Sequence, residues 1–186
     1  MGWFVLATIK PVIVWFRQDL RLQDNEAINA AIDLQRPIIL VYIKEEDSSA
    51  TWRVGQASAW WLHHALNALA KDLKGLGLKL ILRKGVCLDE LLKLIQETSA
   101  DTLFWNRCYE PYSIKRDSDI KRSLKSQDVD VKSFNASLLV EPWEVSTKQK
   151  KPFQVFTPFF NACLKFEVKK PVSLSSKPLI SYSKSL

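Results

Sequence analysis

The sequence predicts an α/β fold: a doubly wound, Rossmann-like parallel sheet of five strands in the order 3-2-1-4-5, with helices on both faces. Short β-rich apolar runs alternate with longer segments of helical periodicity, an order typical of parallel sheets. The first two runs are almost entirely apolar, as central parallel strands should be. The third run carries Lys79 and Arg83, and the fifth alternates apolar with polar residues, so both are expected at the edges.

The five strands are expected at short runs rich in β-branched and aromatic residues, which suit a pleated and half-buried surface. In chain order they cover residues 12–16, 38–43, 78–83, 102–105 and 129–134. The first reads VIVWF and the second reads IILVYI, directly after Pro37. The predicted order makes the first strand central.

Helices are expected between the strands, at residues 25–34, 56–74, 88–98 and 113–126. Asp24 is the expected N-cap of the first helix, because a side-chain oxygen there can accept from a free amide of the first turn. In the second helix, four leucines from Leu62 to Leu73 recur at helical spacing and predict its buried face. Trp60 and Trp61 are expected to pack in the core or at an interface.

The pattern changes after residue 146, and we expect an α/β domain at 1–146 followed by an aromatic segment and a basic linker at 147–186. Residues 152–166, PFQVFTPFFNACLKF, are aromatic-rich and predict a helix after Pro158. From Lys169 onward Ser, Lys and Pro are frequent and no period is sustained, which is typical of a linker. A chain that ends in a linker is expected to be a fragment of a longer protein.

Composition argues against several classes of protein. The net charge is +7, but residues 1–147 carry 19 basic and 19 acidic residues, so the excess lies in the last 39 residues and indicates a solvated tail more than a nucleic-acid groove. No apolar run approaches the roughly 20 residues that span a bilayer. The three cysteines form no CxxC pair, which disfavours zinc and predicts reduced thiols in a cytoplasmic protein.

A doubly wound sheet binds ligands at the carboxyl ends of its strands, where the strand order reverses; here this is between the first and fourth strands. The loop after the first strand, RQDLRLQDN at 17–25, contains no glycine, so a backbone cradle for pyrophosphate is disfavoured. Its charged residues allow two interpretations. Either they form a salt-bridge network that fixes the loop, or some of them face a bound planar anion.

The loop after the fourth strand, NRCYEPYSIKRD at 106–117, places Asn106 and Arg107 at the same crevice. Further along, Asp117 and Lys121 can pair at i, i+4 on a solvated helix face. His63 and His64 are adjacent on a helix and point about 100° apart, so they cannot share a metal ion. The residues alone therefore indicate an α/β ligand-binding module with no visible catalytic machinery.

Five segments of the chain, in order, resemble the DNA photolyase/cryptochrome family, and bacterial photolyases most closely. They are VWFRQDLRLQDN (14–25), WRVGQASAWWLHHALNAL (52–69), NRCYEPYSIKRD (106–117), SFNASLLVEPWEV (133–145) and PFQVFTPFFNACLK (152–165). The resemblance covers about residues 11–166 and implies the amino-terminal domain of a light-dependent lyase, in which reduced FAD splits pyrimidine dimers in UV-damaged DNA.

The resemblance also implies that FAD, the DNA surface and the electron-relay tryptophans belong to a following helical domain, so no catalytic residue is expected in this chain. Phe153, Phe156, Phe159 and Phe160 are candidates for the face that docks that domain. Two alternatives stay open: a cryptochrome photoreceptor, which signals without repairing DNA, and a free-standing flavin- or nucleotide-binding module.

In the family this domain supports an antenna pigment, a deazaflavin, a flavin or a methenyl folate, which passes excitation to FAD. By matching motif positions, a flavin-type pigment would be lined by Phe16, Arg17, Tyr42, Ile43, Lys44, Arg53, Asn106, Arg107, Cys108, Tyr109 and Glu110. One folate-binding branch has an Asn-Glu pair where this chain has Tyr112 and Ser113, and Glu110 aligns with the acid before that pair. The resemblance favours no single pigment.

Overall fold

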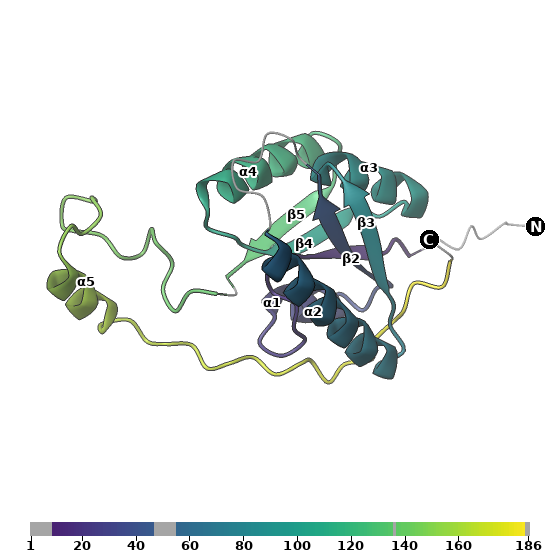
Figure 1. Ribbon diagram of the computed structural model, residues 1–186, viewed down its shortest axis with the longest axis horizontal. Coiled ribbons are helices and arrows are strands. Elements are labelled where there is room, and N and C mark those ends of the chain that lie inside the picture. The colour runs from purple at the N-terminus through teal and green to yellow at the C-terminus, as the bar shows by residue number, and fades with distance from the viewer. Residues whose placement is uncertain (1–8, 47–54, 136, 185–186) are drawn as a thin grey trace, which may run out of the picture.

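The structure, a computed structural model, describes residues 9–46, 55–135 and 137–184. Its centre is a parallel sheet of five strands in the order β3-β2-β1-β4-β5, as the sequence predicts (Figure 1). The strands are β1 (Val12–Phe16), β2 (Ile38–Glu45), β3 (Leu80–Gly85), β4 (Thr102–Asn106) and β5 (Asp130–Phe134). The reversal of strand order therefore falls between β1 and β4.

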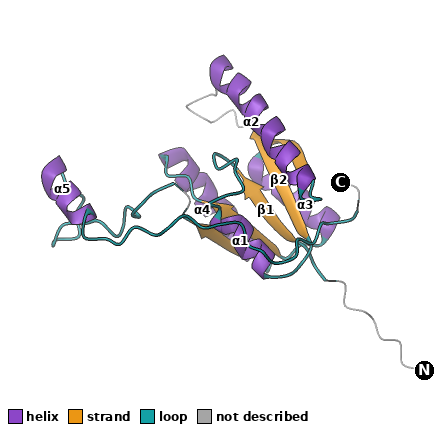
Figure 2. Cartoon of the chain, turned by 90° about the horizontal axis from the view of Figure 1, so that it is seen from below, coloured by secondary structure: helices purple, strands orange, loops and turns teal. Residues whose placement is uncertain are grey.

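Four helices cover the sheet on two sides, and a fifth lies apart from it (Figures 1 and 2). They are α1 (Glu26–Asp33), α2 (Gln56–Gly75), α3 (Cys87–Thr98), α4 (Pro111–Lys125) and α5 (Phe156–Cys163). Helices α1 and α2 pack on one face, and α3 and α4 pack on the other. No described helix is long and apolar enough to cross a membrane.

The central strand β1 is buried on both faces because every one of its side chains is apolar. Successive strand residues point to opposite sides of a sheet. Ile13 and Trp15 accordingly join the core under α3 and α4, while Val12, Val14 and Phe16 join the core under α1 and α2. The run VIVWF thus supplies two separate cores at once.

One local prediction is wrong and a second is narrowed. The N-cap of α1 is Asn25 and not Asp24: Asn25 has the extended backbone of a cap, and its side chain accepts from the amide of Ile28 at 3.2 Å. Asp24 instead has a left-handed φ of 52° in the preceding turn. Of the two places expected for Trp60 and Trp61, the core is excluded, since they are 63% and 71% exposed, and an interface stays a prediction. The buried residues of α2 are in its second half, and its first half extends past the sheet (Figure 2).

The Ser-, Lys- and Pro-rich end of the chain does not hang free, as a flexible linker would. Residues 172–182, which we call the strap, run back along α1 to the amino end of β2 (Figure 1). The amide of Asp24 donates to the carbonyl of Val172, and the amide of Ile38 donates to the carbonyl of Ile180, both at 2.8 Å. Ser181 adds a parallel bridge beside Ile38. Backbone pairing therefore orders a segment that has no helical or strand period.

Residues 147–168, which we call the α5 arm, extend away from the sheet and its four helices (Figures 1 and 2). Its helix begins at Phe156, two residues before Pro158, which sits in the first turn where proline is tolerated. No residue of α5 is buried. Phe156 is 72% exposed and stacks on Phe160 of the same helix, with the ring centroids 5.6 Å apart.

Candidate functional site

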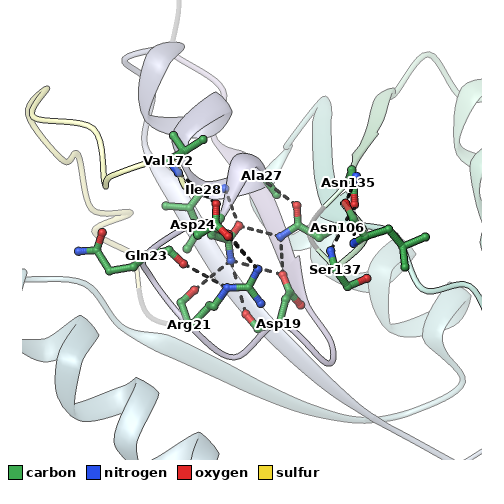
Figure 3. Close-up of polar contacts among 12 residues, drawn as sticks. Asp19, Arg21, Gln23, Asp24, Ala27, Ile28, Asn106, Asn135, Ser137 and Val172 are labelled. Carbon is green, nitrogen blue, oxygen red and sulfur yellow. Dashed lines mark hydrogen bonds and ion pairs between the residues drawn. The ribbon is translucent and has the colours of Figure 1, made fainter. Parts of the chain in front are cut away.

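Asn106, the last residue of β4, fixes the loop that follows β1 (Figure 3). Its side chain is almost completely buried, at 2% exposed. Its Nδ2 donates to Oδ2 of Asp19 at 2.6 Å and to Oδ1 of Asn25 at 2.8 Å, and its Oδ1 accepts from the amide of Ala27 at 3.2 Å. One side chain therefore ties the two strands of the switch point and the start of α1 together.

Arg17, directly after β1, is buried and bonded through its terminal nitrogens in the same region, while its Nε has no hydrogen-bond partner among the described residues. Its guanidinium forms an ion pair with Asp117 of α4 and donates to the carbonyl oxygen of Asn106. It also lies over the ring of Trp15, 4.9 Å from the centroid. Of the two interpretations of loop 17–25, the salt-bridge network is the one that the contacts of Arg17 support.

The amino-terminal half of α4 turns toward the sheet, so the prediction of a solvated face is wrong there. The side chains of Arg116 and Asp117 are only 16% and 13% exposed. Asp117 pairs with Arg17 and with Arg116 (2.9 Å) in place of the expected Lys121, whose Nζ donates to Oγ of Ser133 at 3.2 Å. Arg17 and Ser133 lie outside α4 and Arg116 is the immediate neighbour of Asp117, so the i, i+4 spacing of a helix could not identify these partners.

A further set of contacts joins α4 to the end of β2. Oε1 of Glu45 accepts from the hydroxyl of Tyr112 at 2.9 Å, and its Oε2 accepts from Nη1 of Arg116 at 2.6 Å. Sequence reasoning missed Glu45 because the second strand was predicted to stop at residue 43, two residues too early. The sequence could have indicated Glu45 as a site residue, because it is a carboxylate at the carboxyl end of an inner strand, where doubly wound sheets bind their ligands.

Arg107 and Tyr109 face away from the switch point, toward the segment after β5. Both bind the buried carboxylate of Glu141: Nε of Arg107 donates at 3.1 Å and the Tyr109 hydroxyl donates at 2.8 Å. Burial, followed by the contact with Glu141, raises the pKa of Tyr109 to about 12. The Arg107 guanidinium also lies 5.4 Å from the ring centroid of Trp143. These two candidates therefore bind Glu141 and Trp143 of the segment after β5.

The other candidates differ in exposure. Phe16 and Ile43 are buried in the cores on opposite faces of the sheet, and Cys108 and Tyr42 are half-buried. Lys44 and Glu110 are exposed, and Oε1 of Glu110 accepts from Nε2 of Gln18 at 2.8 Å. Arg53 lies outside the described residues. The structure thus brings Arg17, Asn106 and Glu110 together at the carboxyl edge, and it leaves the pigment-binding role of all eleven residues as a prediction.

The described residues contain no group of three or more His, Cys, Asp or Glu side chains placed to hold a metal ion. Across the same ranges, His63 and His64 are exposed on α2, where His64 packs against Trp60 with the ring centroids 4.3 Å apart. The described side chains of the carboxyl edge form ion pairs and hydrogen bonds with one another.

We expect the thiol of Cys87, at the start of α3, to be unreactive in the folded chain. Burial, followed by the nearby carboxylate of Glu45, raises its pKa to about 12. An unfolded thiol ionises near a pKa of about 8.5. The contribution of Cys87 to stability is therefore complete below that pH and falls as the pH rises toward 12.

The test uses a Cys108→Ser, Cys163→Ser variant, in which Cys87 is the remaining thiol. A colorimetric thiol reagent at pH 8 should detect no thiol in the folded variant and one thiol after unfolding in urea. Rapid labelling of the folded variant at this pH would contradict the prediction.

The sequence and the fold of this chain are both similar to those of known proteins. The DNA photolyase family model matches residues 12–176. The chain is 45% identical over 152 residues to the deoxyribodipyrimidine photo-lyase of Agrobacterium fabrum (82% of this chain and 31% of that protein). It is 37% identical over 172 residues to Cryptochrome-1 of Arabidopsis thaliana (91% and 25%). The crystal structure of a bacterial class III photolyase from Agrobacterium tumefaciens superposes with a TM-score of 0.89 at 39% identity (99% and 38%).

Proposed function

Since the chain belongs to the DNA photolyase family, we propose that it is the amino-terminal domain of a deoxyribodipyrimidine photo-lyase, a light-dependent enzyme that splits pyrimidine dimers in UV-damaged DNA. The observation that carries this proposal is the likeness to bacterial photo-lyases across the whole sheet and the α5 arm. The chain spans 31% of the length of that photo-lyase, so the lyase activity belongs to the longer protein.

The first partner is the carboxy-terminal FAD domain of that longer protein, which would carry the flavin and contact the DNA. The α5 arm supports this, because an eight-residue helix with no buried residue has little stability of its own. Its exposed apolar side chains include Phe156, Phe159, Phe160 and Leu164. A second apolar surface that covers them would remove this area from water, and each Å² of apolar surface buried contributes a stabilising free energy of about 25 cal/mol.

The role of this domain is to hold the antenna pigment, a deazaflavin, a flavin or a methenyl folate. A pigment supplies light absorption and energy transfer, so the chain has to provide binding and orientation and needs no nucleophile or metal. The carboxyl edge supports this role, because its polar groups are held rigidly by Asn106 and Arg17. A pigment there would lie against the exposed Lys44 and Glu110. The three cysteines are free thiols, which is consistent with a cytoplasmic location.

The proposal is tested with the full-length protein that contains this domain. An oligonucleotide with one cyclobutane dimer is illuminated with blue light after reduction of FAD, and chromatography follows restoration of the intact bases. We expect repair in the light and none in the dark control.

The second candidate function is a cryptochrome photoreceptor, which the 37% identity to Arabidopsis Cryptochrome-1 favours. A full-length protein that binds FAD and responds spectroscopically to blue light but leaves the dimer unrepaired would overturn the lyase proposal in favour of this one.

A further inference from the structure

The carboxyl edge of the sheet, where the strand order reverses, is bridged by side chains of the chain itself. Glu45 at the end of β2 receives Tyr112 at 2.9 Å and Arg116 at 2.6 Å, both from α4, which follows β4. The central strand β1 lies between β2 and β4. These contacts therefore reach across the end of β1, over the position where a doubly wound sheet normally receives its ligand.

The Arg116 guanidinium is held on three sides. Asp117 pairs with its Nη2 at 2.9 Å, Glu45 pairs with its Nη1 at 2.6 Å, and the ring of Trp15 lies 5.2 Å from its Cζ. The side chains of Arg116 and Glu45 are 16% and 23% exposed. Partly buried charge-assisted contacts of this kind are stronger than exposed ion pairs.

A weaker bridge spans the neighbouring pair of strands. Nε2 of Gln18, from the loop after β1, donates to Oε1 of Glu110, from the loop after β4, at 2.8 Å on the surface. Beneath it, Arg17 pairs with Asp117. A planar ligand that enters the edge from solvent therefore meets side chains already bonded to one another.

We propose that Glu45, Tyr112 and Arg116 form a latch that closes the carboxyl edge, and that a flavin-like planar ligand enters there only when the latch is open. This rests on the proposed function in taking the carboxyl edge as the pigment side of the domain. The apparent affinity of a ligand falls in proportion to the fraction of molecules in the competent state. The latch therefore lowers the affinity of the domain for flavins that enter at this edge.

The experiment titrates the 186-residue chain with riboflavin, a neutral flavin, and follows quenching and anisotropy of flavin fluorescence. Glu45→Ala removes both latch contacts and leaves Arg116 paired with Asp117. Tyr112→Phe removes one hydroxyl and keeps the ring. The matched control is Glu46→Ala, which removes the adjacent carboxylate and its exposed ion pair with Lys84 (2.7 Å) and leaves the latch intact. Thermal melts confirm that each variant is folded.

We expect Glu45→Ala to bind riboflavin about tenfold or more tightly than the unmodified chain, Tyr112→Phe to give a smaller gain, and Glu46→Ala to give none. Equal binding by the unmodified chain and both latch variants, including no binding by any of them, would overturn the latch. An equal gain in Glu46→Ala would overturn it too, because a general loss of negative charge would then explain the effect. The repair assay on the full-length protein is read separately, so failure of one proposal is distinguishable from failure of the other.

Discussion

Replacing Asn106 with alanine is expected to lower the free energy of unfolding by about 2–4 kcal/mol, since it removes three hydrogen bonds between buried groups and leaves the Ala27 amide without its acceptor. The Asn106 amide donates to the carboxylate of Asp19 at 2.6 Å, and Asp19 is itself only 7% exposed. The same substitution removes the acceptor of the Ala27 amide and a donor to Asn25. Urea denaturation followed by circular dichroism measures the loss.

Asn67→Ala is the matched control for Asn106→Ala. Asn67 is exposed on α2, and its side chain bonds to Nε2 of His63 at 3.0 Å. Loss of an exposed contact of this kind should change the free energy of unfolding by less than about 0.5 kcal/mol. A loss below about 1 kcal/mol for Asn106→Ala would mean that loop 17–25 is held by contacts other than this side chain.

The sheet order could be predicted because hydrophobic patterning is a property of each segment taken alone. The run VIVWF at residues 12–16 has no polar face, so it belongs in the centre of a sheet, and β3 with its Arg83 belongs at an edge. Burial of an apolar strand requires no particular partner, only an apolar one. The apolar and charged patterns of the individual strands were therefore sufficient to predict their order in the sheet.

The partners of the charged residues could not be predicted in this way. Arg17 and Asp117 lie 100 positions apart, and no local period relates them. Asp117 has a lysine four residues later, which local spacing favours, yet it pairs with Arg17 because α4 rests on the end of β1, and with the adjacent Arg116. An ion pair depends on a few ångströms of side-chain geometry, which is fixed only after the strands have been placed.

The order of the strap could not be predicted from the sequence either. A flexible linker and an extended segment that pairs with a neighbour have similar compositions, and only the second contacts the folded body. The strap contributes Leu174 and Leu179 to the core under α1 and α2, and Ser175 donates its amide to Oδ1 of Asn29 at 2.9 Å. Removing it therefore exposes surface and frees hydrogen-bonding groups that the rest of the chain cannot satisfy.

Ending the chain at Val168 is expected to lower the free energy of unfolding by about 2–4 kcal/mol, since half-buried leucines and several backbone hydrogen bonds are lost together. Amide hydrogen exchange gives the more specific measurement, because the amides of Asp24 and Ile38 bond to the strap and should lose protection while the amides inside β1 keep theirs. The matched point variants are Leu179→Ala, which removes a core contact, and Ile180→Ala, at a residue 38% exposed beside it. Leu179→Ala should cost more than Ile180→Ala, because its side chain packs against the core. Unchanged protection of the Asp24 and Ile38 amides in the shortened chain would show that the strap follows the fold of the body without stabilising it.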